Sequence, residues 1–157
     1  MSFIPLTQGK FAVVDESDVK MLSEWSWCVN AYGYARRAYR VGGKLTEMWM
    51  HRYILGAEPG KDVDHINGDK LDNRRCNLRI CTRSQNLMNK RVSNSHTSRY
   101  KGVFWEKRHK RWVAKISCAG KQHYLGEYKD EWDAACSYNA KALELFGEFS
   151  RLNVKDV

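Results

Sequence analysis

Residues 64–90 read DHINGDKLDNRRCNLRICTRSQNLMNK, and four polar positions in this stretch, Asp64, His65, Asn77 and Asn86, guide the interpretation of the whole chain. Eleven residues separate His65 from Asn77, and eight separate Asn77 from Asn86. A loop, a strand and a helix of these lengths can fold back and bring the four side chains together. The DHINGD segment alone also suits an ordinary Asn-Gly turn, because Asp and Asn are common in turns. The full spacing, flanked by several arginines, favours a functional cluster.

These residue types suit the hydrolysis of a phosphodiester. That reaction needs a base to take a proton from water and a cation to stabilise the charge on the phosphate and the leaving oxygen. Histidine titrates near neutrality, so His65 is the candidate base. Asp64 and the amide oxygen of Asn86 are candidate metal ligands, and two oxygen ligands favour Mg²⁺ or Mn²⁺ over Zn²⁺. Asn77 is expected to orient the His65 ring toward the water.

The stretch 48–91, which includes MWMHRYILG and the DHINGD segment, resembles the HNH endonucleases, particularly those of phages and the intron-encoded homing type. The resemblance implies a ββα-metal finger, in which two strands and a helix surround one cation. It assigns His65 as the general base, Asp64 as a metal ligand, Asn77 as the central asparagine and Asn86 as the final motif position. Some family members have a histidine at the last position and bind a softer metal, so Asn86 supports Mg²⁺ or Mn²⁺.

Composition limits the possible partners and compartments. The 157 residues suffice for one ordinary domain or two small ones, and 43% hydrophobic residues predict a packed core. A net charge of +9 indicates a polyanionic partner, for which nucleic acid is favoured over a membrane surface. The N-terminus has no basic leader with an apolar stretch, which predicts a cytoplasmic protein, in the host cell if the gene belongs to a phage. The five scattered cysteines predict reduced thiols and disfavour structural zinc.

Residues 1–47 are rich in aromatic and strand-forming residues. Phe11–Val14 is predicted as a short strand, Ser17 as the N-cap of a helical turn reaching Trp25, and Gly42-Gly43 as the turn of a hairpin. The aromatic residues are expected to pack a small core, with base stacking by one of them as the alternative. They are Trp25, Trp27, Tyr34, Tyr39 and Trp49.

Two further features surround the finger. His51 lies in MHRYILG, a predicted short helix, and is expected to support the metal site without ligating the metal; a phosphate contact or a packed core histidine are the alternatives. The run from Arg74 to Arg91 has six basic residues and no acidic one, which indicates contact with phosphate. The candidate DNA contacts in this run are Arg74, Arg75, Arg79 and Arg83.

After a polar linker at 91–98, residues 99–124 contain eight basic residues and one acid, Glu106. Three strands are predicted at about 101–106, 111–117 and 121–127, with one sheet face carrying Arg and Lys. A helix with Asp130 as its N-cap should follow and end at Gly147. Its core face is predicted from helical spacing as Trp132, Ala135, Cys136, Asn139, Ala142, Leu143 and Phe146.

Residues 99–153 resemble the Apetala-type, or ethylene-response-factor, DNA-binding domain through YKGV, RWVAKI, YLGEY, DAACSYNAKAL and the closing LN. The resemblance implies a three-stranded sheet in the major groove, which is about 12 Å wide. Lys101 replaces the family's usual arginine, and lysine lacks the planar fork for bidentate guanine contact. The implied DNA contacts are Lys101, Trp105, Lys107, Arg108, Arg111, Trp112, Lys115, Lys121 and Tyr124.

The sequence therefore predicts an α+β fold: a ββα-metal nuclease domain at 1–90 with a β-rich N-terminal extension, a linker at 91–98, and a three-stranded antiparallel sheet packed on one helix at 99–157. The expected function is a sequence-directed DNA endonuclease of the homing type. One active site per chain predicts nicking by a monomer, unless a homodimer cuts both strands. The alternatives are a non-catalytic DNA-binding regulator and an RNA substrate, although the A-form major groove is too narrow for the sheet.

Overall fold

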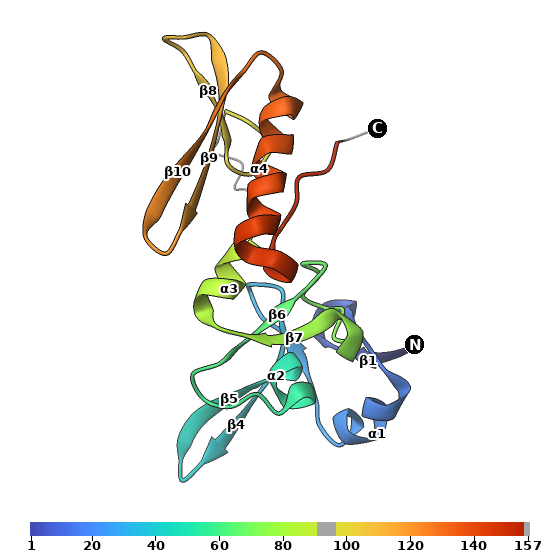
Figure 1. The fold of residues 1–157 in the computed structure, drawn as a ribbon. Helices are drawn as coiled ribbons and strands as arrows, with labels where there is room; N and C mark the ends of the chain where they lie inside the picture. Colours follow the sequence, from blue (N-terminus) through green and yellow to red (C-terminus); the bar gives the residue numbers. More distant parts are fainter. Residues whose placement is uncertain (91–96, 156–157) are drawn as a thin grey trace. The chain divides into compact units, whose positions relative to one another are not determined.

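The computed structural model describes residues 1–90 and 97–155, which belong to two compact units, Met1–Asn86 and Leu87–Val157 (Figure 1). Antiparallel sheets and helices make up both units, which confirms the predicted α+β fold class. Most of the predicted linker, residues 91–96, lies outside the described residues. Across the described ranges, no helix is long and apolar enough to cross a membrane.

The N-terminal unit begins with two antiparallel strands, β1 (Ser2–Pro5) and β2 (Phe11–Val14), joined through the 3-10 turn η1 (Thr7–Gly9). Helix α1 (Glu16–Ser23) follows β2 directly. The prediction of Ser17 as the N-cap was wrong, because Asp15 occupies that position with extended backbone angles. The early start places two acidic residues in the first turn, where the helix dipole favours negative charge.

A hairpin and a short helix lead toward the finger. Strand β3 (Cys28–Val29) pairs with β4 (Ala35–Val41), which pairs with β5 (Lys44–Trp49). The predicted Gly42-Gly43 turn is confirmed, and both glycines have positive φ (54° and 79°), as a two-residue hairpin turn requires. Helix α2 (Met50–Leu55) begins where β5 ends, and it stops at Gly56, whose φ of 58° is a left-handed cap.

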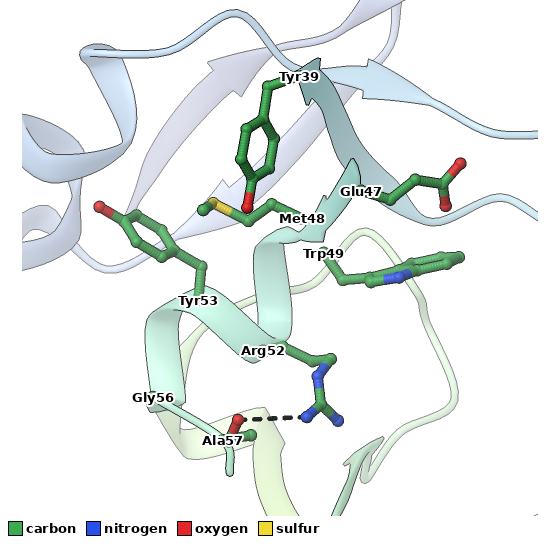
Figure 2. A pocket seen from close by; sticks show the side chains of 8 residues that line it. All are labelled: Tyr39, Glu47, Met48, Trp49, Arg52, Tyr53, Gly56 and Ala57. Atoms are coloured by element: carbon green, nitrogen blue, oxygen red, sulfur yellow. Dashed lines mark hydrogen bonds between the residues drawn. The ribbon is translucent and has the colours of Figure 1, made fainter. Parts of the chain in front are cut away.

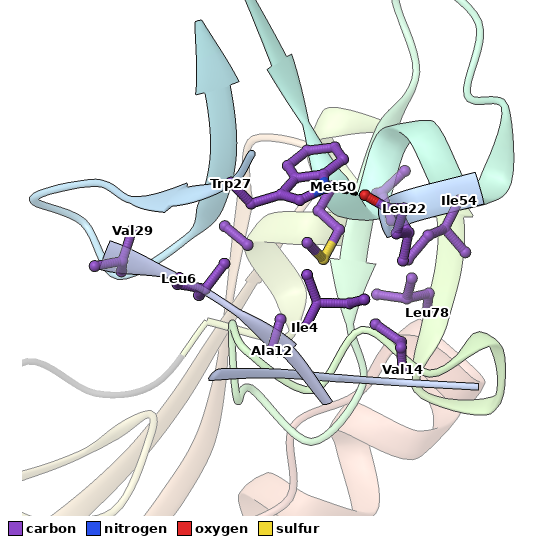
Figure 3. Close-up of a cluster of buried hydrophobic side chains, with 12 residues drawn as sticks. Ile4, Leu6, Ala12, Val14, Leu22, Trp27, Val29, Met50, Ile54 and Leu78 are labelled. Atoms are coloured by element: carbon purple, nitrogen blue, oxygen red, sulfur yellow. Dashed lines mark hydrogen bonds between the residues drawn. The ribbon is translucent and has the colours of Figure 1, made fainter. Parts of the chain in front are cut away.

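The core of this unit gathers around Met50, which is fully buried (Figure 3). Side chains from β1, β2, α1 and α2 converge there, and Trp27 donates its indole N–H to the Leu22 carbonyl at 2.9 Å. Of the aromatics predicted to pack a small core against the finger, Trp27 is buried here, and the half-buried Tyr34 packs against His65 and Trp49. Trp25 is 40% exposed and Tyr39 is half-buried, so these two lie outside the core. Small aliphatic side chains from the short strands fill the space instead.

The finger has the expected order of two strands and a helix. Strand β6 (Asp62–His65) pairs antiparallel with β7 (Leu78–Cys81), and helix α3 (Arg83–Met88) follows. The 3-10 turn η2 (Arg75–Asn77) closes the intervening loop. Thr82 and Gln85 form a capping box at the start of α3, since each side chain bonds the other's backbone N–H, at 2.8 and 3.2 Å.

In the C-terminal unit, β8 (Val103–Glu106), β9 (Arg111–Cys118) and β10 (Lys121–Tyr128) form an antiparallel sheet with β9 in the middle. Helix α4 (Glu131–Phe146) packs on one face and ends before the 3-10 turn η3 (Gly147–Phe149). The predicted N-cap is confirmed: the Asp130 carboxylate accepts from the backbone N–H of Trp132 and Asp133.

The predicted core face of α4 was partly wrong. Cys136 is exposed and Leu143 is 51% exposed, whereas Tyr138 is buried against Ile116. Small alanines let the helix approach the sheet, so the large Tyr138 ring fills the gap that remains. It lies against Gly102 so closely that a Cβ there would be 2.1 Å from the ring. Asn153, in the closing LN, anchors the terminal segment by bonding the backbone of Lys101 and the Asn139 side chain.

Candidate active site

His65 is the last residue of β6 and is buried, with 5% of its surface exposed. Its Nε2 lies 3.3 Å from Asn73 Oδ1, and this contact is a hydrogen bond in the tautomer that carries the hydrogen on Nε2. Burial lowers the pKa of His65, although the bond to Asn73 and the nearby Asp64 act in the opposite direction. The ring is therefore a neutral base at neutral pH.

Asn73 was not singled out from the sequence. It is completely buried, and its backbone N–H donates to the Val13 carbonyl at 2.7 Å, which ties the loop between β6 and β7 to β2. The neighbouring Val13 N–H donates to Leu71 in return, at 2.8 Å. The N-terminal strands thus fix the residue that orients His65, and no local spacing signal in the sequence points to this long-range contact.

Asn77 serves the same loop through both groups of its buried amide. Nδ2 donates to the Asp72 carbonyl at 2.7 Å, and Oδ1 accepts from the Asn67 backbone N–H at 3.0 Å. The expected orienting contact with the His65 ring is made by Asn73 instead. Asn77 acts on His65 indirectly, because it closes the loop that carries Asn73.

Asp64 and Asn86, the candidate metal ligands, have different partners. Asp64 is 6% exposed and accepts from Arg79 Nε and Nη2, at 3.0 and 2.7 Å. Asn86 donates its Nδ2–H to Asp62 Oδ2 at 2.9 Å, and this bond is the main cause of the lowered pKa of Asp62. An amide that donates through nitrogen keeps its oxygen for a cation, so Asp62 sets the orientation of Asn86.

A pocket of about 260 Å³ lies beside Asn86 and Asp62. His51 of α2 lines it, and the His51 ring packs edge-on against His65 with 5.0 Å between centroids. Burial, and then His65, lower the pKa of His51 to about 3, so this ring is also neutral. Within residues 1–90 and 97–155, its Nδ1 is one of the buried atoms without a hydrogen-bond partner. The lining is Tyr34, Trp49, His51, Arg52, Asp62, Val63, Arg83 and Asn86.

Arg52 lines this pocket and has a structural role. It also lines an adjacent pocket, which Figure 2 shows. Its guanidinium donates to the carbonyls of Ala57 and Glu58, at 3.2 and 2.9 Å, and also to that of Lys61. These bonds hold the loop between α2 and β6 and so fix the position of the helix relative to the strand. His51 and His65 sit on those two elements.

The four arginines of the finger that were expected to bind DNA each meet a carboxylate. The pairs are Arg74–Asp72, Arg75–Asp18, Arg79–Asp64 and Arg83–Asp62. The Arg79 side chain is only 12% exposed, so it does not fit a role at the surface. Arg83 and Arg75 remain open to solvent, with side chains 78% and 50% exposed.

The strand register of the C-terminal sheet separates its predicted DNA contacts. Trp105 and Trp112 pair across strands, with 5.0 Å between ring centroids, and Trp112 packs on the side covered by α4. Arg111, Lys115 and Tyr124 share the opposite, open face. The predicted contacts at the turns between strands are Lys107, Arg108 and Lys121, all exposed.

Lys101 also departs from the expected contact. It is partly buried, and its ammonium donates to the Met88 carbonyl. Burial, with help from the nearby Arg151, lowers the pKa of Lys101 to about 8. This lysine therefore connects the segment before β8 to the end of α3 within the C-terminal unit.

Comparison with known proteins agrees with the finger. The model of the HNH endonuclease family matches residues 45–88. The chain is 36% identical over 157 residues to an uncharacterised HNH endonuclease of Acanthamoeba polyphaga mimivirus, covering 95% of this chain and 78% of that protein. This chain belongs to the HNH endonuclease family. It is also 32% identical over 92 residues to protein 3.8 of Escherichia phage T7, covering 59% of this chain and 75% of that protein.

Family membership makes this protein an HNH endonuclease, an enzyme that hydrolyses phosphodiester bonds in DNA. HNH nucleases generally use a divalent metal ion. Hard oxygen donors suit such an ion, and Asp64 and Asn86 offer a carboxylate and an amide oxygen whose nitrogen is already engaged. No cluster of three His, Cys, Asp or Glu ligands occurs in the described part of the chain.

Proposed function

We propose that this protein is a homing-type endonuclease that nicks one strand of duplex DNA at a sequence selected by its C-terminal unit. The observation that carries the proposal is the state of His65. The ring is buried, burial lowers its pKa, and its Nε2 lies 3.3 Å from the Asn73 side-chain oxygen. A neutral imidazole needs no prior deprotonation before it accepts a proton from water.

The proposed roles around the scissile phosphate follow from the contacts of each side chain. His65 takes the proton from the attacking water, and the contact with Asn73 holds the ring in place. Asn77 holds the loop that carries Asn73. His51 packs against His65 and fixes the plane of the ring, which retains the expected supporting role without ligation.

Asp64 and Asn86 are the proposed ligands of one Mg²⁺ or Mn²⁺ ion. Arg79 fixes the direction of the Asp64 carboxylate through its ion pair, and Asp62 fixes the Asn86 amide by accepting its Nδ2–H. A bound divalent ion supplies positive charge to the phosphate and the leaving oxygen. Because both ligands are oxygens, the site favours these hard ions over zinc.

The C-terminal unit is proposed as an Apetala-type reader that lays its open sheet face in the major groove. Arg111 and Lys115 alternate along the central strand on that face, and Tyr124 pairs with Lys115 on β10. Alternation on a strand places such side chains along one line, which suits contact with a groove. Trp105 and Trp112 are assigned to the core side, so the reader differs there from the contact set that the resemblance implies.

Nicking of a supercoiled plasmid that carries DNA from the source genome tests the proposal. We expect relaxation in Mg²⁺ or Mn²⁺ that EDTA prevents and that the His65→Ala protein does not perform. His109→Ala removes an exposed histidine of the C-terminal unit and is the matched control. Intact plasmid under every metal, together with a mobility shift of the same DNA, would instead favour a DNA-binding regulator with an inactive finger.

A further inference from the structure

The β4–β5 hairpin carries a feature that the nuclease site does not use. Strand β3 pairs with β4 only at Ala35 and Arg36, so from Arg37 onward β4 and β5 form a two-stranded ribbon with no further partner strand in the described part of the chain (Figure 1). All six residues from Arg40 to Leu45 are exposed. Isolated two-stranded ribbons are marginally stable in water, so their projection away from a core needs an explanation.

The composition of the ribbon tip is amphipathic on both faces. Val41 pairs with Lys44 on one face, and Arg40 pairs with Leu45 on the other, so each face presents one cation and one apolar side chain. Val41 is 59% and Leu45 61% exposed. Arg40 bonds the Gly43 carbonyl at 2.8 Å, which orders the tip without neutralising its charge.

The root of the ribbon is stiffened. The Arg37 guanidinium lies 3.8 Å from the centroid of the Trp25 ring and 5.1 Å from that of Tyr39. Arg36 pairs with Glu47 on the opposite face. The partly exposed Trp25 and Tyr39 thus support the hairpin, which explains why these two aromatics lie outside the main core.

The ribbon also leads directly into the active site. Trp49, its last residue, lines the pocket beside Asn86, and His51 lies two residues further on. At about 3.4 Å per residue, the tip at Lys44 lies about 17 Å along the strand from Trp49. That length corresponds to about five base pairs of a duplex with a rise of 3.4 Å.

We infer that the β4–β5 ribbon is a DNA-binding element that enters the major groove about five base pairs to one side of the nick. A two-stranded ribbon fits this groove, basic side chains complement the flanking phosphates, and apolar side chains can contact thymine methyl groups. The inference rests on the proposed nuclease function and adds a second contact region, in the same unit as the active site. The ligand is the duplex that is cut.

The test compares two double variants in the full-length chain, on a duplex spanning the nicked position. Arg40→Ala with Lys44→Ala removes the tip charges, and Lys10→Ala with Lys20→Ala removes two exposed cations of the same unit on other elements. Because the Arg40/Lys44 variant loses two phosphate contacts, its slope of log affinity against log salt should be less steep by about 1.8. Between 50 and 200 mM salt, its affinity should therefore fall about tenfold less than that of the wild type. The control should keep the wild-type slope.

Methylation protection locates the contact, because guanine N7 lies in the major groove. The wild-type chain should protect guanines about five base pairs from the nick, and the Arg40/Lys44 variant should lose only that protection. A second variant, Val41→Ser with Leu45→Ser, should weaken binding without changing the salt slope. The inference is overturned if wild type nicks the DNA but the Arg40/Lys44 variant matches the control in slope and protection. Failure of wild type to nick or bind would instead refute the proposed function.

Discussion

Replacing Asn77 with alanine separates a structural role from a catalytic one. Its buried amide closes the loop between β6 and β7 through two bonds, to the Asn67 N–H and the Asp72 carbonyl. Leaving a buried polar group without a partner costs about 1–3 kcal/mol. Asn67 is exposed and water can satisfy its N–H, whereas Asn77 and Asp72 are buried. We therefore expect a loss of about 2–4 kcal/mol in the free energy of unfolding.

For a unit of this size, each kcal/mol lowers the midpoint of thermal unfolding by about 4–8 °C, so Asn77→Ala should lower it by roughly 8–32 °C. Thermal unfolding followed by circular dichroism measures this shift. Nicking assayed well below both midpoints should fall less than in His65→Ala, because the base itself is still present. If Asn77→Ala melts close to wild type yet is as inactive as His65→Ala, the clamping role is wrong and Asn77 acts on the ring directly.

Three further perturbations test other parts of the structure. His51 and His65 have folded pKa values below the ordinary 6.5, so the unfolded chain takes up protons first as the pH falls. The contribution of these histidines to stability should be complete above about pH 6.5 and decline as the pH falls toward about 3. Urea midpoints at several pH values check this, and His51→Phe should flatten the pH dependence. Gly102→Ala, with φ of +75° and a Cβ 2.1 Å from Tyr138, should destabilise the C-terminal unit by about 3 kcal/mol or more, whereas Gly120→Ala, at φ +76° in open space, should cost about 1 kcal/mol; denaturant unfolding compares them. Lys115→Met should reduce the salt slope of DNA binding by about 0.9, whereas Lys101→Met, whose ammonium bonds Met88, should leave the slope unchanged; an equal reduction by both would contradict the assignment of Lys101.

Local patterns predicted the elements of both units well. The Gly42-Gly43 turn, the β6–β7–α3 order and the Asp130 cap each depend on residues close together in the chain. The helix α1 begins two residues earlier than predicted, with Asp15 and not Ser17 as its N-cap. Ser and Asp are both good N-caps, so residue type alone did not decide between them. The predicted core face of α4 was wrong at Leu143. Helical spacing is compatible with more than one buried face, and the packing of the sheet decides which face is buried.

The chemistry of the site was less predictable because its supports come from distant segments. Asn73 lies eight residues after His65 and is fixed by Val13, which belongs to a strand about sixty residues earlier. The role of Asp62 depends on its meeting Asn86, 24 residues later. A spacing motif identifies residues that must meet for catalysis, but it does not identify the residues that hold them.

The ion pairs of the finger change where positive charge is available for DNA. In sequence, the stretch from Arg74 to Arg91 has no acidic residue, yet the fold supplies a carboxylate to four of its arginines. A cation already paired with a carboxylate contributes little net charge toward a phosphate at any distance beyond contact. The cations of the ribbon tip and of the open C-terminal sheet face carry no such pair in the described part of the chain. The salt dependence of DNA binding should therefore be set by these two surfaces, while Arg79 and Arg83 orient the active-site acids Asp64 and Asp62.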